Sequence, residues 1–209
     1  MARGLEHAAH EAVQPDAILS EAVAARRSQL VAVVQVEVVV AGAAEVGGLT
    51  IPDRTGVGGQ ELVLNGAGVR TRVVFKVYVG ALYLPAKART LVEVLAKGPR
   101  RIQLSVLRNL TPDQLIDALV DGLKANNGEA ELAAIKSQQE QMVATMKSFG
   151  DVKEKDVVTL DFVDGGTQIG LNGQVKSTIP GEAFNAALTK VWLGDKPAQE
   201  DLRKAMLGG

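Results

Sequence analysis

The order of the predicted elements indicates an α+β fold, with helices packed on one face of a large antiparallel β-sheet. Two stretches with strand periodicity, 60–84 and 100–107, precede a helical block over 112–149. Further strands follow over 157–179, and the last predicted element is a helix over 181–193. Runs of strands that do not alternate one by one with helices are typical of antiparallel sheets covered on one side by helices.

The strongest strand pattern covers residues 69–83, where mainly apolar odd positions alternate with the even positions Arg70, Arg72, Val74, Lys76 and Tyr78. This period of two predicts one half-buried strand. Arg70 and Tyr78 then project from the same side, which the core does not use. A guanidinium and a phenol together suit a carboxylate, so this pair is the candidate ligand site. Arg72 and Lys76 are also at even positions and therefore project from the same side as this pair. They could form a rim of positive charge around the site or simply contact solvent.

Simpler structural roles are open to both residues of this pair. Arg70 could be a surface arginine that pairs with a carboxylate, since strand edges often carry such charges. Tyr78 could be an amphipathic side chain at the margin of the core.

The remaining elements follow from periodicity and from end signals. A turn-rich loop is predicted over 51–59, a short strand over 61–65 and a helix over 88–97. Thr111 and Pro112 start the next helix, which presents Leu115 and Leu119 on one face. A single long helix is predicted over 129–149, with Met142 and Met146 in its apolar stripe. Both methionines fit core filling, or the adaptable lining of an apolar ligand cleft.

Gly66 and Gly68 lie in the run GAGVRT, which holds two of the three glycines of a dinucleotide-binding fingerprint. The third glycine is missing and a strand follows rather than a helix, which excludes that motif. The predicted role of the two glycines is backbone freedom at a tight bend. Their lack of a Cβ could also let a ligand head group approach the chain near Arg70.

Composition excludes several classes of function. The net charge of −1 gives no electrostatic reason to expect nucleic acid or an anionic membrane as partner. The chain has no cysteine, which excludes thiolate metal sites and cysteine nucleophiles. His7 and His10 are its only histidines, so residues 45–209 hold no Ser-His-Asp triad. We predict no metal site and no cofactor.

The first 44 residues are predicted to be an N-terminal extension to one domain over 45–209. Residues 30–42 are apolar, follow Arg26 and Arg27, and precede small residues, a pattern similar to a secretory signal. Gln35 and Glu37 interrupt the apolar run, and an amphipathic strand is the alternative. We expect a periplasmic or secreted protein, with a cytoplasmic one as the alternative. The segment is too short and too polar to span a bilayer.

The run GAGVR followed by KVYVGALYL resembles the chalcone isomerase superfamily. Within this superfamily, the sequence most resembles the bacterial chalcone isomerase-like proteins and the plant fatty-acid-binding members. The resemblance extends over roughly residues 45–207 through the strand RRIQLSVL and the helix LTPDQLIDALVDGL. It implies an open-faced sandwich, in which a ligand cleft lies between a large antiparallel sheet and its layer of helices.

Most catalytic residues of true chalcone isomerases are not matched in this sequence. Arg70 matches the arginine that stabilises the developing charge, whereas Tyr78 stands where those enzymes have a threonine. Leu115, Ala118 and Gly122 stand where they have a tyrosine, a lysine and an asparagine. None of these three can donate a side-chain hydrogen bond. The Ser/Thr of the last helix falls near Asn185.

In the fatty-acid-binding members, an arginine and a tyrosine at the positions of Arg70 and Tyr78 hold the carboxylate. We therefore expect a carrier or sensor of a fatty acid or another small amphipathic carboxylate. The expected ligand-binding residues are Arg70, Tyr78, Leu115, Leu119, Met142 and Met146.

Two alternatives to a carrier remain. One is an intramolecular lyase of the chalcone isomerase type, acting on a flavonoid-like ligand with Arg70 as its catalytic residue. The other is a non-catalytic interaction protein with a vestigial cleft.

Overall fold

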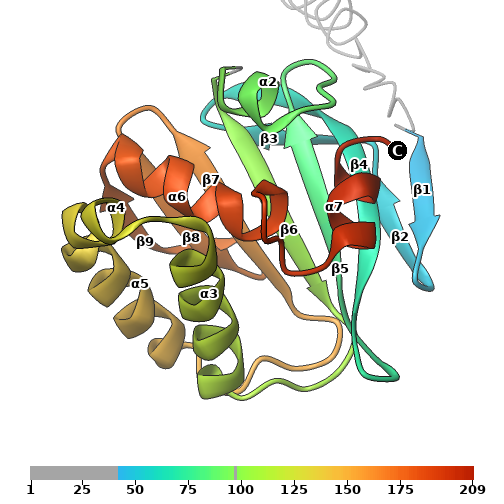
Figure 1. The fold of residues 1–209 in the computed structure, drawn as a ribbon. Coiled ribbons are helices and arrows are strands. Elements are labelled where there is room, and N and C mark those ends of the chain that lie inside the picture. Colours follow the sequence, from blue (N-terminus) through green and yellow to red (C-terminus); the bar gives the residue numbers. More distant parts are fainter. Residues whose placement is uncertain (1–41, 97) are drawn as a thin grey trace, which may run out of the picture. The chain divides into compact units, whose positions relative to one another are not determined.

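The computed structural model describes residues 42–96 and 98–209, so the predicted export segment lies outside the described part except for Gly42. Seven strands form one antiparallel sheet in sequence order (Figure 1). They are β3 (Arg54–Val57), β4 (Gln60–Arg72), β5 (Phe75–Leu84), β6 (Arg100–Val106), β7 (Val157–Val163), β8 (Gly166–Leu171) and β9 (Gln174–Pro180). The prediction of a large antiparallel sheet is confirmed.

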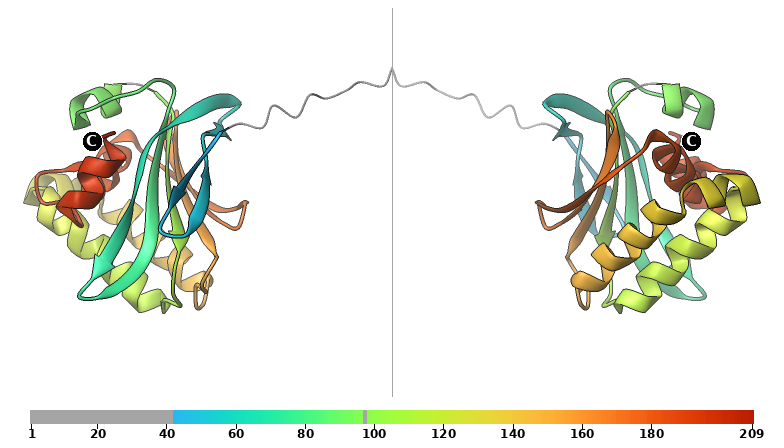
Figure 2. Two further views of the ribbon diagram at one scale, coloured as in Figure 1. Left: turned by 90° about the vertical axis from the view of Figure 1, so that its right-hand side faces the viewer. Right: turned by 90° about the vertical axis from the view of Figure 1, so that its left-hand side faces the viewer.

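The helices lie on one face of this sheet, and a small hairpin lies on the other (Figure 2). The helices are α2 (Leu91–Ala96), α3 (Pro112–Asn126), α4 (Glu129–Ala134), α5 (Lys136–Ser148), α6 (Glu182–Leu193) and α7 (Glu200–Met206). The hairpin consists of β1 (Ala43–Val46) and β2 (Leu49–Pro52). The predicted α+β architecture, with its helices on one face, is therefore confirmed.

The prediction of one strand over 69–83 is wrong, because this stretch is a β-hairpin. β4 ends at Arg72, Val73 and Val74 form the turn, and β5 begins at Phe75. Arg70 and Tyr78 are directly opposite partners across the hairpin. Such cross-strand partners share a face of the sheet, so the pair does lie together, but not for the predicted reason. A two-residue turn is usually marked by glycine or asparagine, and this one carries two valines.

Both faces of β5 are covered, which corrects the expectation that the face with Tyr78 lies away from the core. Tyr78, Leu82 and Leu84 belong to the main core between the sheet and the helices. Val79 and Tyr83 belong to a second, smaller core on the opposite face. The β1–β2 hairpin contributes Ile51 to that second core.

Three further elements differ from the prediction. The stretch 51–59, predicted as a loop, contains the end of β2 and all of β3. The predicted helix over 129–149 is interrupted at Ile135, whose φ of −110° and ψ of 11° separate α4 from α5. Helix α7 was not predicted, since its seven residues are too few to show a clear periodicity.

The start of α3 is as predicted, because its end signals are local. Thr111 accepts a hydrogen bond from the backbone N–H of Gln114, and the side chain of Gln114 accepts one from that of Thr111. This reciprocal capping box, with Pro112 at the first helical position, fixes where α3 begins.

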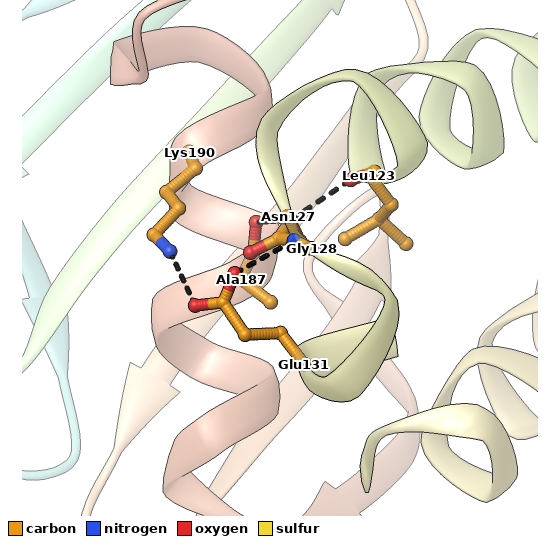
Figure 3. A network of polar contacts seen from close by, with 6 residues as sticks. All are labelled: Leu123, Asn127, Gly128, Glu131, Ala187 and Lys190. Atoms are coloured by element: carbon orange, nitrogen blue, oxygen red, sulfur yellow. Dashed lines mark hydrogen bonds and ion pairs between the residues drawn. The ribbon is translucent and has the colours of Figure 1, made fainter. Parts of the chain in front are cut away.

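Helices α3 and α6 pack closely because Gly122 has no side chain. A Cβ at Gly122 would lie 2.6 Å from Val191 Cγ1 on α6. The same two helices are joined by polar contacts around the α3–α4 turn (Figure 3). The Asn127 side chain donates hydrogen bonds to Leu123 O at 3.0 Å and to Ala187 O at 3.3 Å. These contacts fix the position of α3 against α6.

An ion pair next to this turn links α4 to α6. Lys190 Nζ lies 2.9 Å from a carboxylate oxygen of Glu131. The other oxygen accepts a hydrogen bond from the backbone N–H of Gly128 at 2.8 Å. These hydrogen bonds, first that from Lys190, lower the pKa of Glu131.

A tyrosine in the second core should make the stability of the protein depend on pH in the alkaline range. Tyr83 donates a hydrogen bond to Pro52 O at 2.9 Å, and burial raises its pKa to about 12. The unfolded chain ionises this phenol near pH 10. Its contribution to stability is therefore complete below pH 10 and is lost as the pH rises from 10 to 12. Chemical denaturation across this window should show a steeper loss for the wild type than for Tyr83→Phe. If wild type and Tyr83→Phe lose stability equally between pH 10 and 12, the raised pKa of Tyr83 is contradicted.

Candidate functional site

A cleft of about 800 Å³ opens between α3 and the end of the β4–β5 hairpin. Its sheet side is formed by β4, β5 and β6, including Tyr78 and Leu104. Its helical side is formed by α3, including Leu115 and Leu119, and by the end of α6. The loop after α6, 196–198, the loop after β6 with Arg108 and Leu110, and the hairpin turn with Val73 also contribute to the lining. The volume lies within the range of roughly 300–1,000 Å³ that is usual for small-molecule sites.

Arg70 lies half-buried on the lining of this cleft and is held by the segment before α7. Its Nη1 donates to the backbone O of Thr71 at 2.5 Å and to the side-chain oxygen of Gln199 at 3.2 Å. The same Gln199 oxygen accepts the backbone N–H of Thr71 at 2.8 Å. Gln199 thus fixes one end of the guanidinium.

Arg70 forms no ion pair within residues 42–96 and 98–209. This observation argues against the simpler role of a surface arginine paired with a carboxylate. A guanidinium carries five N–H groups, and Nη1 supplies only two of them. Arg70 also hydrogen-bonds to the Tyr78 hydroxyl, and its remaining N–H groups retain the capacity to bind an anion.

Tyr78 is buried at the floor of the cleft, with 9% of its surface exposed. Trp192 Nε1 donates a hydrogen bond to its hydroxyl at 3.0 Å. Burial raises the pKa of Tyr78, and this rise is partly offset by the hydrogen bond from Trp192 and by the charge and a hydrogen bond of Arg70. The phenol is therefore neutral at neutral pH. Since indole can only donate, the phenol oxygen is the acceptor, and the Tyr78 O–H remains a donor.

The remainder of the cleft is mixed in character. Leu115, Leu119, Leu104 and Val191 provide apolar surface. The charged lining residues are Arg70, Arg72, Arg108, Lys196, Asp117 and Asp121. Cations outnumber carboxylates by four to two, and the two carboxylates lie one helical turn apart on α3. The balance of charge favours an anionic ligand.

The structure brings four of the six predicted ligand-binding residues to the cleft: Arg70, Tyr78, Leu115 and Leu119. It does not bring Met142 and Met146 there. Both methionines are fully buried in the main core, and α5, which carries them, contacts β9 and α3. Their stripe was correctly recognised as apolar, but periodicity alone does not show which part of a core a stripe faces.

Of the positions that match catalytic residues of chalcone isomerases, some line the cleft and one does not. Leu115, Ala118 and Gly122 do line the cleft from α3. Asn185 does not line it, because its buried side chain accepts a hydrogen bond from Thr167 and donates to Val163 O. The described cleft therefore has no tyrosine, lysine or amide side chain at the three α3 positions.

Gly66 and Gly68 have another role than the one predicted. Neither has a positive φ, so neither serves a tight bend. A Cβ at Gly66 would lie 2.0 Å from Ala205 O, and one at Gly68 would lie 2.8 Å from Ala205 Cβ. The element that approaches the bare backbone is α7, not a ligand head group.

Gln199, immediately before α7, is a site residue that the sequence did not reveal. The signal that could have revealed it is the pair of alternate glycines, because glycine within a strand often marks the close approach of another backbone. They could not show that this segment comes from the last ten residues. The structure therefore adds the positioning of Arg70 by the C-terminal segment.

A testable consequence concerns the hydroxyl of Tyr78. In Tyr78→Phe the buried Trp192 N–H loses its acceptor, which should lower the free energy of unfolding by about 1–3 kcal/mol. Urea denaturation followed by far-UV circular dichroism measures the change. A double variant, Tyr78→Phe with Trp192→Phe, should lose less than the sum of the two single variants. Additive losses would show that this hydrogen bond contributes nothing.

The described residues contain neither a candidate metal site nor a candidate membrane-spanning helix. No group of three or more His, Cys, Asp or Glu side chains in the described chain could hold a metal ion. Likewise, no helix within 42–209 is long and apolar enough to cross a membrane.

Comparisons with known proteins agree with this fold. A fatty-acid binding protein of Arabidopsis thaliana superposes with a TM-score of 0.58 at 13% identity, over 77% of this chain and 92% of that chain. At this identity the likeness concerns the fold. Comparison with curated protein sequences found no match. The chalcone isomerase-like family matches residues 43–208, which is most of the chain. This chain belongs to the chalcone isomerase-like family.

Proposed function

We propose that this protein binds a fatty acid, or another small amphipathic carboxylate, in the cleft beside α3. The observation that carries this proposal is the position of Arg70 and Tyr78. They are cross-strand partners on the lining of one partly apolar cleft, and Arg70 has no carboxylate partner within the described chain.

The head group would be bound at the hairpin side of the cleft. Arg70 offers the N–H groups that Thr71 and Gln199 do not use, in a planar arrangement that matches a carboxylate. Tyr78 adds its O–H, which is neutral because burial raises its pKa. Since Gln199 already fixes the guanidinium, little side-chain freedom is lost on binding.

The hydrocarbon part would lie against the apolar side chains of α3 and β6. Leu115 and Leu119 lie one turn apart on α3, and Leu104 lies on the sheet side. Met142 and Met146 are left out of this proposal because they do not line the cleft. The Arabidopsis protein of the same fold is described as a fatty-acid binding protein, which supports a ligand of this class.

The isomerase alternative is less well supported by the cleft. Arg70 could stabilise a developing negative charge, but Ala118 and Gly122 offer no side-chain proton donor beside it. Bond formation that needs a positioned acid, base or water would therefore lack its partners on α3.

Trp192 provides the test, because it is the only tryptophan and lines the cleft. Delipidated protein should show a saturable change in fluorescence with palmitate. Hexadecanol, which has the same chain without the carboxylate, should bind about tenfold more weakly or worse, because hydrogen bonds to charged groups contribute roughly 1.5–3 kcal/mol. Native mass spectrometry should show one bound acid per chain.

The result that would overturn the proposal is equal affinity for palmitate and hexadecanol, or no binding of laurate, palmitate or oleate. A chalcone cyclisation assay with the same protein tests the alternative. Turnover above the uncatalysed rate that is abolished in Arg70→Ala would establish an isomerase.

A further inference from the structure

We infer that the tip of the β4–β5 hairpin docks onto the surface of an anionic lipid bilayer. The tip consists of Val73, Val74 and Phe75, three consecutive apolar residues with exposed fractions of 89%, 78% and 56%. It forms a free end of the longest hairpin of the sheet (Figure 1). A cluster of large apolar side chains in water is unfavourable unless another apolar phase covers it.

The conformation of the tip adds a second cost. Val73 has a φ of 57°, in the left-handed region that β-branched residues rarely adopt. Glycine or asparagine would fit this turn without strain. A strained and exposed valine therefore stabilises neither the turn nor the core, which favours a role in contact with something outside the chain.

The charges around the tip indicate the chemistry of that contact. Arg72 and Lys76 flank it in sequence, and the Arg108 guanidinium lies 4.6 Å from the centre of the Phe75 ring. None of these three cations forms an ion pair with another described residue. The sequence has no aspartate or glutamate between Leu62 and Val92. The overall charge of −1 conceals this local basic cluster.

An apolar tip surrounded by cations is complementary to the interface of an anionic bilayer. The valines and the phenylalanine would enter the boundary between head groups and acyl chains, while Arg72, Lys76 and Arg108 contact lipid phosphates. A protein partner with an apolar pocket is the competing occupant. It is less favoured because it would also need an acidic rim to match the three unpaired cations.

The location of the tip gives the docking a consequence. Val73, Phe75, Arg72 and Arg108 all lie on the lining of the cleft that contains Arg70 and Tyr78. A docked hairpin would therefore place the cleft next to the bilayer, where amphipathic carboxylates partition. This last step rests on the proposed function, whereas the docking itself does not.

Co-sedimentation with vesicles tests the docking without any added fatty acid. The full chain should sediment with phosphatidylcholine vesicles that contain phosphatidylglycerol, and much less with phosphatidylcholine alone. Binding should fall at least fivefold in high salt, because salt screens the contacts of exposed cations. A charge variant, Arg72→Gln with Lys76→Gln, should show a similar loss at low salt.

The tip variant is Val73→Gly with Val74→Ser, and it should lose at least about fivefold in vesicle affinity. Glycine fits a φ of 57°, so the melting temperature of the tip variant should equal or exceed that of the wild type. An unchanged melting temperature would show that a loss of docking is not caused by misfolding. The matched control is Val92→Ser, because Val92 on α2 is 78% exposed but lies away from the hairpin. The control should bind vesicles like the wild type.

Three results would overturn the inference: no binding to anionic vesicles, equal binding of the tip variant and the control, or binding that is indifferent to vesicle charge. A concentration-dependent dimer that disappears in the tip variant, without vesicle binding, would assign the tip to protein contact instead. Arg70→Ala distinguishes the two proposals. This variant should still sediment with vesicles even though its affinity for palmitate falls.

Discussion

Substituting Gly66 by alanine should lower the free energy of unfolding by about 2–4 kcal/mol. The new Cβ would lie 2.0 Å from Ala205 O and 3.1 Å from Gly208 N. Both are backbone atoms, which cannot rotate away as a flexible side chain can. Either the strand is distorted or α7 moves off the sheet, which exposes part of the buried Leu202 and Met206. Overpacking of this kind costs about 1–3 kcal/mol, and burial of a Leu or Met side chain is worth about 1.5–3 kcal/mol.

Chemical denaturation monitored by circular dichroism measures this effect. The matched control is Gly56→Ala, also in a strand, where a Cβ would meet no atom within 4 Å. Its stability should change by less than about 1 kcal/mol, with a slight gain expected from reduced freedom of the unfolded chain. If both alanine variants are equally stable, the close approach of α7 to β4 is wrong.

The same substitution should also weaken ligand binding, although Gly66 does not line the cleft. Gln199 immediately precedes α7 and fixes the Arg70 guanidinium. Displacement of α7 would release Gln199, so Arg70 would have to be ordered again on binding. Palmitate affinity should therefore fall in Gly66→Ala and remain unchanged in Gly56→Ala.

Arg70→Ala should reduce palmitate affinity by about 2–4 kcal/mol, which corresponds to a factor of roughly 30 to 1,000. The alanine removes the only positive charge that stands directly opposite Tyr78 in the hairpin. Arg70→Lys should recover only part of the loss, since an ammonium is a point charge without the planar arrangement of donors. Titration monitored by Trp192 fluorescence gives the affinities.

A charge-matched control for this variant is Arg54→Ala. Arg54 on β3 forms an exposed ion pair with Glu61 on β4, and surface ion pairs contribute at most about 1 kcal/mol to stability. Its palmitate affinity should equal that of the wild type. If Arg70→Ala binds palmitate normally and mainly lowers the melting temperature, Arg70 is a structural residue and the proposed site is wrong.

The sequence predicted those parts of the fold whose signals are local. Thr111 as the cap and Pro112 at the first helical position predicted the start of α3, and strand alternation located β6. The β4–β5 turn was missed because its residues favour a strand. Valine favours strands, and Val73 continues the apolar odd positions of its neighbours, so only tertiary pairing shows that the chain reverses there.

The candidate site was predicted in part for a related reason. Arg70 and Tyr78 were recognised by residue type and by resemblance, and their shared face followed from parity even though the strand assignment was wrong. Met142 and Met146 were misplaced because an amphipathic stripe shows that a face is buried, but not what covers it. Gln199 was missed because it is 128 residues from Thr71, whose backbone it binds.

Gln199 also has a consequence for solubility. Beyond the short β3, the outer side of β4 has no neighbouring strand in the seven-stranded sheet. Gln199 uses its side-chain amide as a substitute for one, accepting from Thr71 N at 2.8 Å and donating to Val69 O at 3.4 Å. Unpaired strand edges recruit strands from other molecules. By occupying the backbone groups of Val69 and Thr71, Gln199 leaves two fewer groups on this side of β4 for a strand from another chain.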